Sequence, residues 1–269
     1  MDRRPIGVFD SGLGGLTAVR ELQRELPHES IVYFGDTGRV PYGNRSAETL
    51  LEYAAQDCRF LLRQDVKMII AACGTVSSVA PEVLDSLPIP AIGVVDPTAA
   101  AAAKTTPHGR IGGIATPATI RSGSFERALA AQGDFAVYTQ ACALFVSLVE
   151  AGWIDPSDEV TRAVARRYLK SLKAEGIDTL ILGCTHFPLL APVIDEVLEG
   201  QVTLIDAGRE TARACAAQLA AHDLLTDSTA FGSSRFFVSD QPDGFVRVAD
   251  MFLGRRVDDV ITRVPPDAL

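Results

Sequence analysis

Short runs of apolar and β-branched residues alternate along the chain with longer segments of helical periodicity. This alternation predicts an α/β protein with parallel sheets, because each strand is followed by a helix that returns the chain to the same edge. The expected strands cover 5–9, 30–34, 68–72 and 91–95, and then 110–115, 135–139, 179–182 and 202–205. The longer helices are expected over 16–26, 46–64, 122–131 and 158–174.

The two sets of four strands resemble one another. Corresponding residues recur in the same order at spacings of 105 to 111 positions: Ile6 and Ile111, Tyr33 and Tyr138, Cys73 and Cys184, Asp96 and Asp206. Four ordered correspondences predict two pseudo-symmetric α/β domains, each with a cysteine at the end of its third strand.

The repeat also predicts the domain limits. Residues 1–96 and 208–269 are expected to form the first domain, and residues 97–207 the second, with crossovers at Asp96-Pro97-Thr98 and Asp206-Ala207-Gly208. Helices over 210–222 and 243–253 and a strand over 235–239 would complete the first domain. Ligands bind outside the carboxyl ends of parallel strands, so an active site is expected in the cleft between the domains.

Composition and charge argue against several classes of protein. The 269 residues carry a net charge of −9, which argues against a general affinity for nucleic acid. Neither a secretory signal nor an apolar run long enough for a membrane span is visible. The five cysteines are scattered and include no CxxC pair, which favours reduced thiols in a cytoplasmic protein over a disulfide framework or a metal site.

Cys73 and Cys184 are the leading candidates for chemistry. Each lies where an apolar strand gives way to a helical pattern, with Gly74-Thr75 after the first and Thr185-His186 after the second. A helix N-terminus lowers the pKa of a thiol, so both are expected to be reactive, although a free cysteine is often only a small buried side chain. Two thiols on opposite walls of a cleft suit one reaction well: one removes a proton from a carbon, and the other returns a proton to its opposite face.

Several polar residues near the predicted strand ends are further candidates. His186 could tune Cys184 by hydrogen bonding, and a carboxylate at Glu150, expected to be buried if it points inward, could pair with that histidine. Asp10 and Ser11 lead into a Gly-rich turn that permits close approach of a ligand, although Asp10 could equally be a helix cap. The glycines of this turn are misplaced for a dinucleotide fingerprint.

Two loops would complete the cleft. Pro41-Tyr42-Gly43 follows the second strand and is also explained by turn chemistry alone. Thr116 and Thr119 follow the strand that mirrors the first one, where their hydroxyls could bind a carboxylate or cap the next helix.

At this point the segments resemble a known family. IGVFDSGLGGLT, YFGDTGRVPYG, AACGTVSSVA, LFVSLVEAGW, LILGCTHFPLL and LIDAG are similar to the glutamate racemases of the aspartate/glutamate racemase superfamily, and FVSDQPDGFVRVADMFLG is similar to the family's C-terminus. The combination of DSGLGG, VPYG and GCTHFPLL is far more specific than any one motif.

The resemblance implies racemisation of glutamate without pyridoxal phosphate or another cofactor, with Cys73 and Cys184 as the two bases. Asp10 would assist Cys73, and His186 and Glu150 would assist Cys184. By motif position the residues in contact with L- or D-glutamate would be Ser11, Tyr42, Gly43, Thr75, Thr119 and Thr185. Substrate contacts are also expected of Asp10, Pro41, Gly74, Thr116 and His186. It also implies a homodimer and D-glutamate for bacterial peptidoglycan synthesis.

One departure from the family affects substrate binding. After the first cysteine the family usually carries asparagine, whose side chain helps to bind the amino acid, whereas this chain carries Gly74. A racemase of aspartate or another amino acid therefore remains an alternative. A decarboxylase needs one cysteine and an amino-acid-binding module needs none, so the paired thiols count against both.

Overall fold

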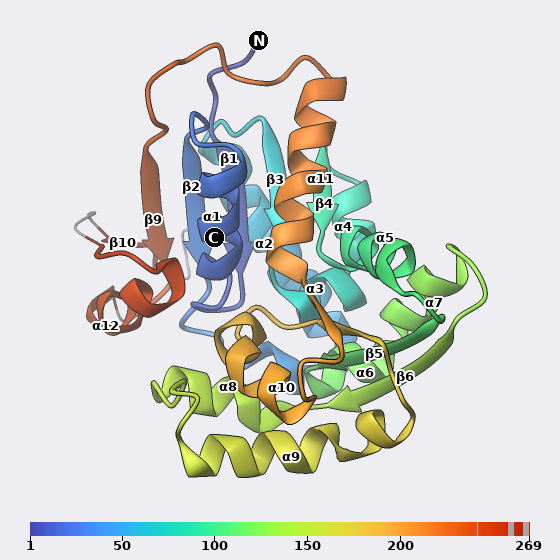
Figure 1. The fold of residues 1–269 in the computed structure, drawn as a ribbon. Coiled ribbons are helices and arrows are strands. Elements are labelled where there is room, and N and C mark those ends of the chain that lie inside the picture. The colour runs from blue at the N-terminus through green and yellow to red at the C-terminus, as the bar shows by residue number, and fades with distance from the viewer. Residues whose placement is uncertain (241, 258–260, 266–268) are drawn as a thin grey trace.

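The computed structural model describes residues 1–240, 242–257, 261–265 and 269, and parts of the predicted first domain (241, 258–260 and 266–268) lie outside the described residues. Two parallel sheets organise the chain, the first in the upper half of Figure 1 and the second in the lower half. This confirms the predicted fold class. The domain limits stay a prediction.

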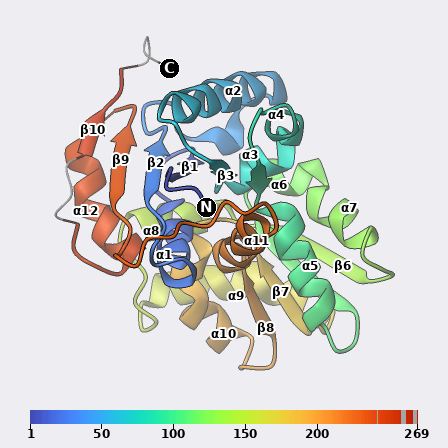
Figure 2. The ribbon, with the colours of Figure 1, turned by 90° about the horizontal axis from the view of Figure 1, so that it is seen from above.

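The first sheet has six strands in the order β10-β9-β2-β1-β3-β4. Its central strands, β1 (Ile6–Asp10), β2 (Ile31–Gly35) and β3 (Met68–Ala71), are buried at every residue, as expected for strands covered by helices on both faces. The remaining strands are β4 (Ala91–Gly93), β9 (Ser234–Val238) and β10 (Ile261–Arg263). Strands β9 and β10 extend the sheet beyond β2 (Figure 2), so the C-terminal part returns to the first sheet as the sequence predicted.

The second sheet repeats the topology of the first. Its order is β6-β5-β7-β8, which matches β2-β1-β3-β4 strand for strand. The strands are β5 (Arg110–Ala115), β6 (Ala136–Ala141), β7 (Thr179–Leu182) and β8 (Thr203–Asp206). The internal repeat read from the sequence is therefore a repeat of sheet topology. In each sheet the chain order reverses next to the first strand, which is where α/β proteins bind ligands.

The helices cover the sheets with apolar faces that their sequence periodicity predicts. In the first half these are α1 (Leu16–Glu25), η1 (Tyr42–Asn44), α2 (Ala47–Arg63), α3 (Gly74–Val79), α4 (Pro81–Asp85) and α12 (Pro242–Leu253). In the second half they are α6 (Pro117–Ser122), α7 (Ser124–Ala130), α8 (Ala143–Glu150), α9 (Glu159–Ala174), η2 (Phe187–Leu190) and α10 (Ala191–Val197). The helix predicted over 122–131 is confirmed as α7, which begins at Ser124 because Gly123 adopts φ +64° and ends the preceding helix α6.

Both predicted crossovers fall at the start of a helix. Asp96 lies in the first turn of α5 (Val95–Thr105), and Asp206 caps α11 (Ala207–Ala221) by accepting hydrogen bonds from the N–H groups of Gly208 and Arg209. The chain therefore passes between the sheets in two helices, and these helices pack against each other while α11 also packs against α1 (Figure 1).

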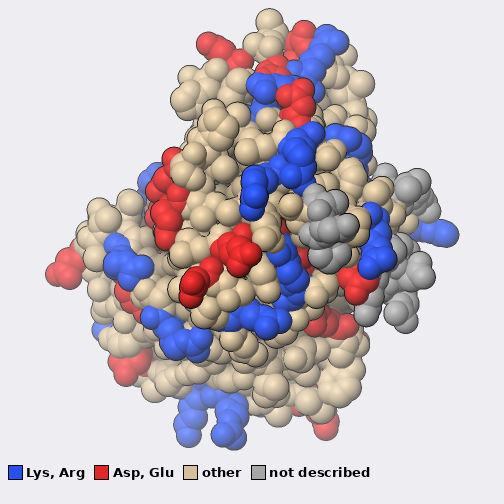
Figure 3. All heavy atoms as spheres, turned by 180° about the vertical axis from the view of Figure 1, so that it is seen from behind, with Lys and Arg blue, Asp and Glu red and all other residues tan. Residues whose placement is uncertain are grey.

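Apolar packing continues from one half into the other. One core cluster includes Ile6, Val8 and Leu22 of the first half together with Phe145 and Leu180 of the second. Among the described residues no helix is long and apolar enough to span a membrane. On the face seen in Figure 3, acidic and basic side chains are interspersed over the described surface.

Candidate active site

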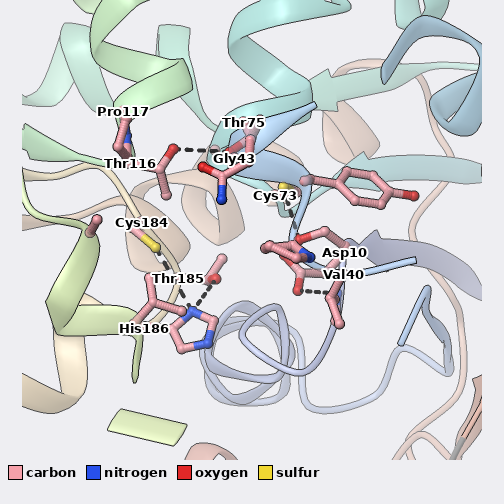
Figure 4. A pocket seen from close by; sticks show the side chains of 18 of the residues that line it. Asp10, Val40, Gly43, Cys73, Thr75, Thr116, Pro117, Cys184, Thr185 and His186 are labelled. Carbon is pink, nitrogen blue, oxygen red and sulfur yellow. Dashed lines mark hydrogen bonds between the residues drawn. The ribbon is translucent and has the colours of Figure 1, made fainter. Parts of the chain in front are cut away.

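A cavity of about 420 Å³ lies between the two halves and collects the carboxyl ends of strands from both sheets. Cys73 and Cys184 each lie two residues beyond the end of a strand, β3 and β7 respectively, and line the cavity from opposite sides (Figure 4). Both cysteines are nearly buried, at 5% and 7% exposure. The switch points of the two sheets therefore present one thiol each to the same space.

Cys73 occupies the N-cap position of α3 and points toward the first Gly-rich turn. Its Sγ lies 3.5 Å from Oγ of Ser11, to which the thiol donates. Burial and, to a smaller extent, the nearby Asp10 carboxylate raise the pKa of Cys73 to about 12, against the lowering effect of the hydrogen bonds with Ser11 and Val76. The expected lowering of this pKa by the helix N-terminus is therefore wrong. The helix has six residues, and its terminus does not offset the loss of solvent around the thiolate.

Cys184 belongs to a chain of contacts that reaches solvent. Its Sγ lies 3.8 Å from Nδ1 of His186, and Nε2 of the same ring lies 3.1 Å from Oε1 of Glu150 at the end of α8. The ring also packs edge-on against Phe252 of α12. The predicted pairing of Glu150 with His186 is confirmed as a contact, but its predicted burial is wrong, since 51% of the Glu150 side chain is exposed at the rim.

His186 is protonated at neutral pH. Burial by itself would lower its pKa, but hydrogen bonds to Cys184 and Glu150, together with the charges of Cys184 and Asp10, raise the pKa to about 10. Both ring nitrogens then carry a proton and donate, one toward sulfur and one toward the Glu150 carboxylate. The cavity thus holds a thiol on the Cys73 side and an imidazolium beside Cys184.

The Gly-rich turn after β1 brings Asp10 and Ser11 to the cavity floor. Oδ2 of Asp10 accepts a hydrogen bond of 2.9 Å from the N–H of Gly12, and burial raises the pKa of this carboxyl above its usual range. Gly14 of the turn touches the opposite wall, because a Cβ at this position would overlap Oγ1 of Thr185 and the His186 ring. Glycine is required here for the two halves to meet.

The loop that carries Pro41, Tyr42 and Gly43 lines the cavity next to Cys73. The Tyr42 hydroxyl points away from the cavity and contacts the carboxylates of Asp36 and Asp57, both fully buried. Burial and the neighbouring Asp36 raise the pKa of Asp57 well above its usual range, which favours the protonated form of this carboxyl.

Arg39 completes this cluster by donating to Asp36 at 2.5 Å and to Asp57 at 3.0 Å. Among the described residues, one buried side-chain polar atom has no hydrogen-bond partner, and this atom is Oδ1 of Asp36. Sequence reasoning did not identify Asp36, Arg39 or Asp57. Asp36 and Arg39 stand just before the VPYG segment, which was a signal for these two, whereas Asp57 comes from α2.

The predicted threonines form a short network. Oγ1 of Thr116 lies 3.0 Å from Oγ1 of Thr75 and 3.1 Å from Oγ1 of Thr119. Thr75 and Thr116 line the cavity, as does Thr185, but Thr119 lies behind Thr116 and is not part of the lining. Gly74 also lines the cavity. The structure therefore brings together every predicted site residue except Thr119.

The lining also contains residues that the sequence did not single out: Gly12, Val40, Asn44, Pro117, Ala143, Leu144, Val146, Ser147 and Gly183. Four of them belong to α8, whose apolar pattern is indistinguishable from a core-facing helix. Lys and Arg do not occur among the described lining residues, so hydroxyl and N–H groups are the donors available to an anionic ligand. No group of three His, Cys, Asp or Glu side chains suited to a metal ion occurs within the described ranges.

Fold and cavity together define a class: an α/β protein built from a repeated parallel sheet, with one thiol from each repeat facing a shared cleft. A sequence model of the Asp/Glu/Hydantoin racemase family matches residues 19–215. The chain is 46% identical to a glutamate racemase of Geobacter metallireducens over 97% of this chain and 96% of that protein. A glutamate racemase of Neisseria meningitidis is also 46% identical, over 96% of each chain.

Solved structures with a similar fold include glutamate racemases, as do the sequence relatives. A glutamate racemase of Francisella tularensis, crystallised in complex with D-glutamate, superposes with a TM-score of 0.92 at 38% identity and full coverage of both chains. An aspartate racemase of Picrophilus torridus shares the fold, with a TM-score of 0.60 at 16% identity over 81% of this chain and 94% of that one. The chain belongs to the Asp/Glu/Hydantoin racemase family and, within it, to the glutamate racemases.

Proposed function

We propose that this protein interconverts L- and D-glutamate by moving a proton between Cys73 and Cys184 without a cofactor. The observation that carries the proposal is the pair of thiols, one from each repeat, on opposite sides of one cavity. A substrate between them exposes one face of its α-carbon to each sulfur. Removal from one face and delivery to the other inverts the centre.

The surroundings of the two sulfurs suit a different role for each in the L-to-D direction. Cys73 is a thiol at neutral pH, the form that delivers a proton. Cys184 lies beside the His186 imidazolium, which can take part in charge balance when that sulfur is a thiolate. In the L-to-D direction, the Cys184 thiolate takes the α-proton, the electron pair stays on the α-carbon, and the Cys73 thiol protonates the opposite face. The Cys73 thiolate starts the reverse reaction.

The α-proton of an amino acid is weakly acidic, so the site must stabilise the carbanion. Both sulfurs are nearly excluded from solvent, which strengthens every electrostatic interaction between site and substrate. We assign the substrate carboxylates to the hydroxyl and N–H donors of Ser11, Thr75, Thr116 and Thr185, and the ammonium to Asp10. Pro41, Tyr42 and Gly43 would shape the wall around the substrate, and Thr119 would act by orienting Thr116.

The proposal extends to the cellular role. D-glutamate from this reaction would supply peptidoglycan synthesis in a bacterial cytoplasm, with glutamate as the small-molecule partner. We also expect a homodimer and no requirement for nucleic acid or a membrane. Support for the substrate comes from the glutamate racemases named above, of which the Francisella protein was crystallised with D-glutamate.

The test is circular dichroism of purified, pyridoxal-free protein with L-glutamate in deuterated water, followed by mass analysis. Racemisation by this route removes the optical signal and places one solvent deuteron on the α-carbon. Loss of signal with L-aspartate but not with glutamate would overturn the proposed substrate. Inactivity with both amino acids would overturn the proposed reaction.

Single-cysteine variants test the assignment of the thiols. We expect Cys73→Ser to abolish α-proton exchange mainly with D-glutamate, and Cys184→Ser mainly with L-glutamate, because each base reaches one face of the α-carbon. Exchange is measured by deuterium incorporation into each enantiomer, with Cys58→Ser as a control because Cys58 lies outside the cavity lining. Equal loss of both exchanges in both variants would contradict separate roles.

A further inference from the structure

The two walls of the cavity lie in close contact at a pair of glycines that flank the cysteines. Gly74 follows Cys73, and Gly183 precedes Cys184. A Cβ placed on Gly74 would lie 2.5 Å from the carbonyl oxygen of Gly183, a separation that real Cβ atoms essentially never show. Ordinary contact begins at 3.4 Å, so a side chain at position 74 requires the walls to separate by roughly 1 Å.

Gly183 cannot retreat to make this room. Its N–H donates to the carbonyl of Ile114 at 2.8 Å, which fixes it to the neighbouring strand β5. Behind it lie the Phe125 ring and the same Ile114 carbonyl, which a Cβ on Gly183 would meet at 2.7 Å and 3.0 Å. The backbone before Cys184 is therefore held on both sides.

Helix α3, which begins at Gly74, is held just as firmly against the second half. The Thr75 hydroxyl lies 3.0 Å from that of Thr116, and the Ser124 hydroxyl donates to that of Ser78 at 2.9 Å. These contacts keep the N-terminus of α3, and with it Cys73, against the second sheet. Displacement at Gly74 would move both cysteine-bearing segments relative to each other.

We propose that Gly74 is a positioning residue that sets the separation of the two thiols. The missing side chain allows the segment after Cys73 to rest on the Gly183 carbonyl, so the sulfurs face one another across a narrow gap. This inference rests on the proposed two-thiol racemisation and adds a determinant of its rate. Gly74 acts through backbone spacing, in place of the side-chain contact that asparagine would make with the substrate.

Gly74→Ala and Gly74→Asn separate the spacing argument from a side-chain contact. If Gly74 sets the spacing, both variants lower kcat, by about a hundredfold for a shift near 1 Å, while KM changes much less. The isotope effect on kcat with α-deuterated glutamate should rise, because proton transfer becomes more rate-limiting. Values of kcat are normalised to the folded fraction from far-ultraviolet circular dichroism.

Gly113→Ala is the matched control. Gly113 lies in β5 outside the cavity, and its Cβ would meet a single methyl group, Cγ2 of Thr139, at 3.4 Å. This variant should keep the kcat of the wild type. Equal losses in Gly113→Ala and Gly74→Ala would show a general cost of removing glycine and would overturn the inference.

Gly74→Asn decides between the two explanations. A lower KM with unchanged kcat in Gly74→Asn, together with a neutral Gly74→Ala, would overturn the spacing argument in favour of a side-chain contact.

A short bis-alkylating thiol reagent gives a readout that does not depend on turnover. Bridging of Cys73 to Cys184, measured by peptide mass spectrometry, should fall in Gly74→Ala relative to wild type and Gly113→Ala. Unchanged bridging would overturn the inference even in an inactive protein. If bridging falls in Gly74→Ala as expected but the wild-type protein does not racemise glutamate, the proposed function would be overturned instead.

Discussion

Replacement of Glu150 by glutamine measures how much a half-exposed carboxylate contributes to the charge on His186. Oε1 of Glu150 lies 3.1 Å from Nε2 of the ring, but half of the Glu150 side chain faces solvent. Exposed ion pairs contribute about 0.2–1 kcal/mol, and one pKa unit corresponds to about 1.4 kcal/mol. Glu150→Gln should therefore lower the pKa of His186 from about 10 by only about 0.2–0.7 unit.

The assay is a pH titration of the His186 ring followed by NMR in the free protein, which avoids the amino group of the substrate. The chain has four histidines, so a His186→Gln spectrum assigns the signal by subtraction. Glu175→Gln is the control, because Glu175 is exposed and lies outside the cavity lining. A downward shift of two units or more would show that Glu150 dominates the charge on His186. An upward shift would refute the contact altogether.

The same substitution has a consequence for stability with a definite sign. The pKa of His186 is raised from 6.5 to about 10 by folding, so its stabilisation is complete below 6.5 and is lost as pH rises through 10. Wild type and Glu150→Gln should differ by less than about 1 kcal/mol in the free energy of unfolding below pH 6.5. The two curves should converge above pH 10, and a difference that grows with pH would contradict this sign.

Two further predictions concern buried polar clusters. Lys67→Met should lower the free energy of unfolding by about 3–5 kcal/mol, because the fully buried Lys67 ammonium pairs with Glu29 at 2.6 Å. The control is Lys173→Met, which removes the exposed ion pair with Glu199 and should change the free energy of unfolding by less than about 1 kcal/mol. Both values are measured by urea titration, and equal effects of the two substitutions would contradict the role of burial. Tyr42→Phe should cost about 1–3 kcal/mol, because the buried Asp57 acid loses its phenol partner, and an unchanged melting temperature would refute that arrangement.

The sequence by itself determined the architecture and the main chemical groups. Strands buried on both faces, such as 68–71 and 179–182, read as continuous apolar runs, and their repeat in the same order predicted two sheets of equal topology. Because carboxyl ends of parallel strands meet at one edge, the positions of Cys73 and Cys184 after the third strands predicted a shared cleft. These are local properties of the chain, recorded in periodicity and spacing.

The tertiary structure decided how the site is protonated and how closely its walls approach. The sequence predicted a lowered pKa for Cys73, but complete enclosure beside Asp10 raises it instead. Helix periodicity shows that one face of 143–150 is apolar, yet it does not place Glu150 at the solvent edge of that face. A thiol's ionisation depends on everything that surrounds it, and periodicity records only one face of one element.

The contact of Gly74 with Gly183 was not predicted from the sequence. In the sequence Gly74 is a departure from a family pattern, and only the packed structure shows the carbonyl that fills the place of its side chain. The contact joins two turns more than a hundred residues apart, and their separation is fixed by hydrogen bonds and packing on both sheets. Local sequence specifies each turn, whereas the distance between the turns is a property of the whole fold.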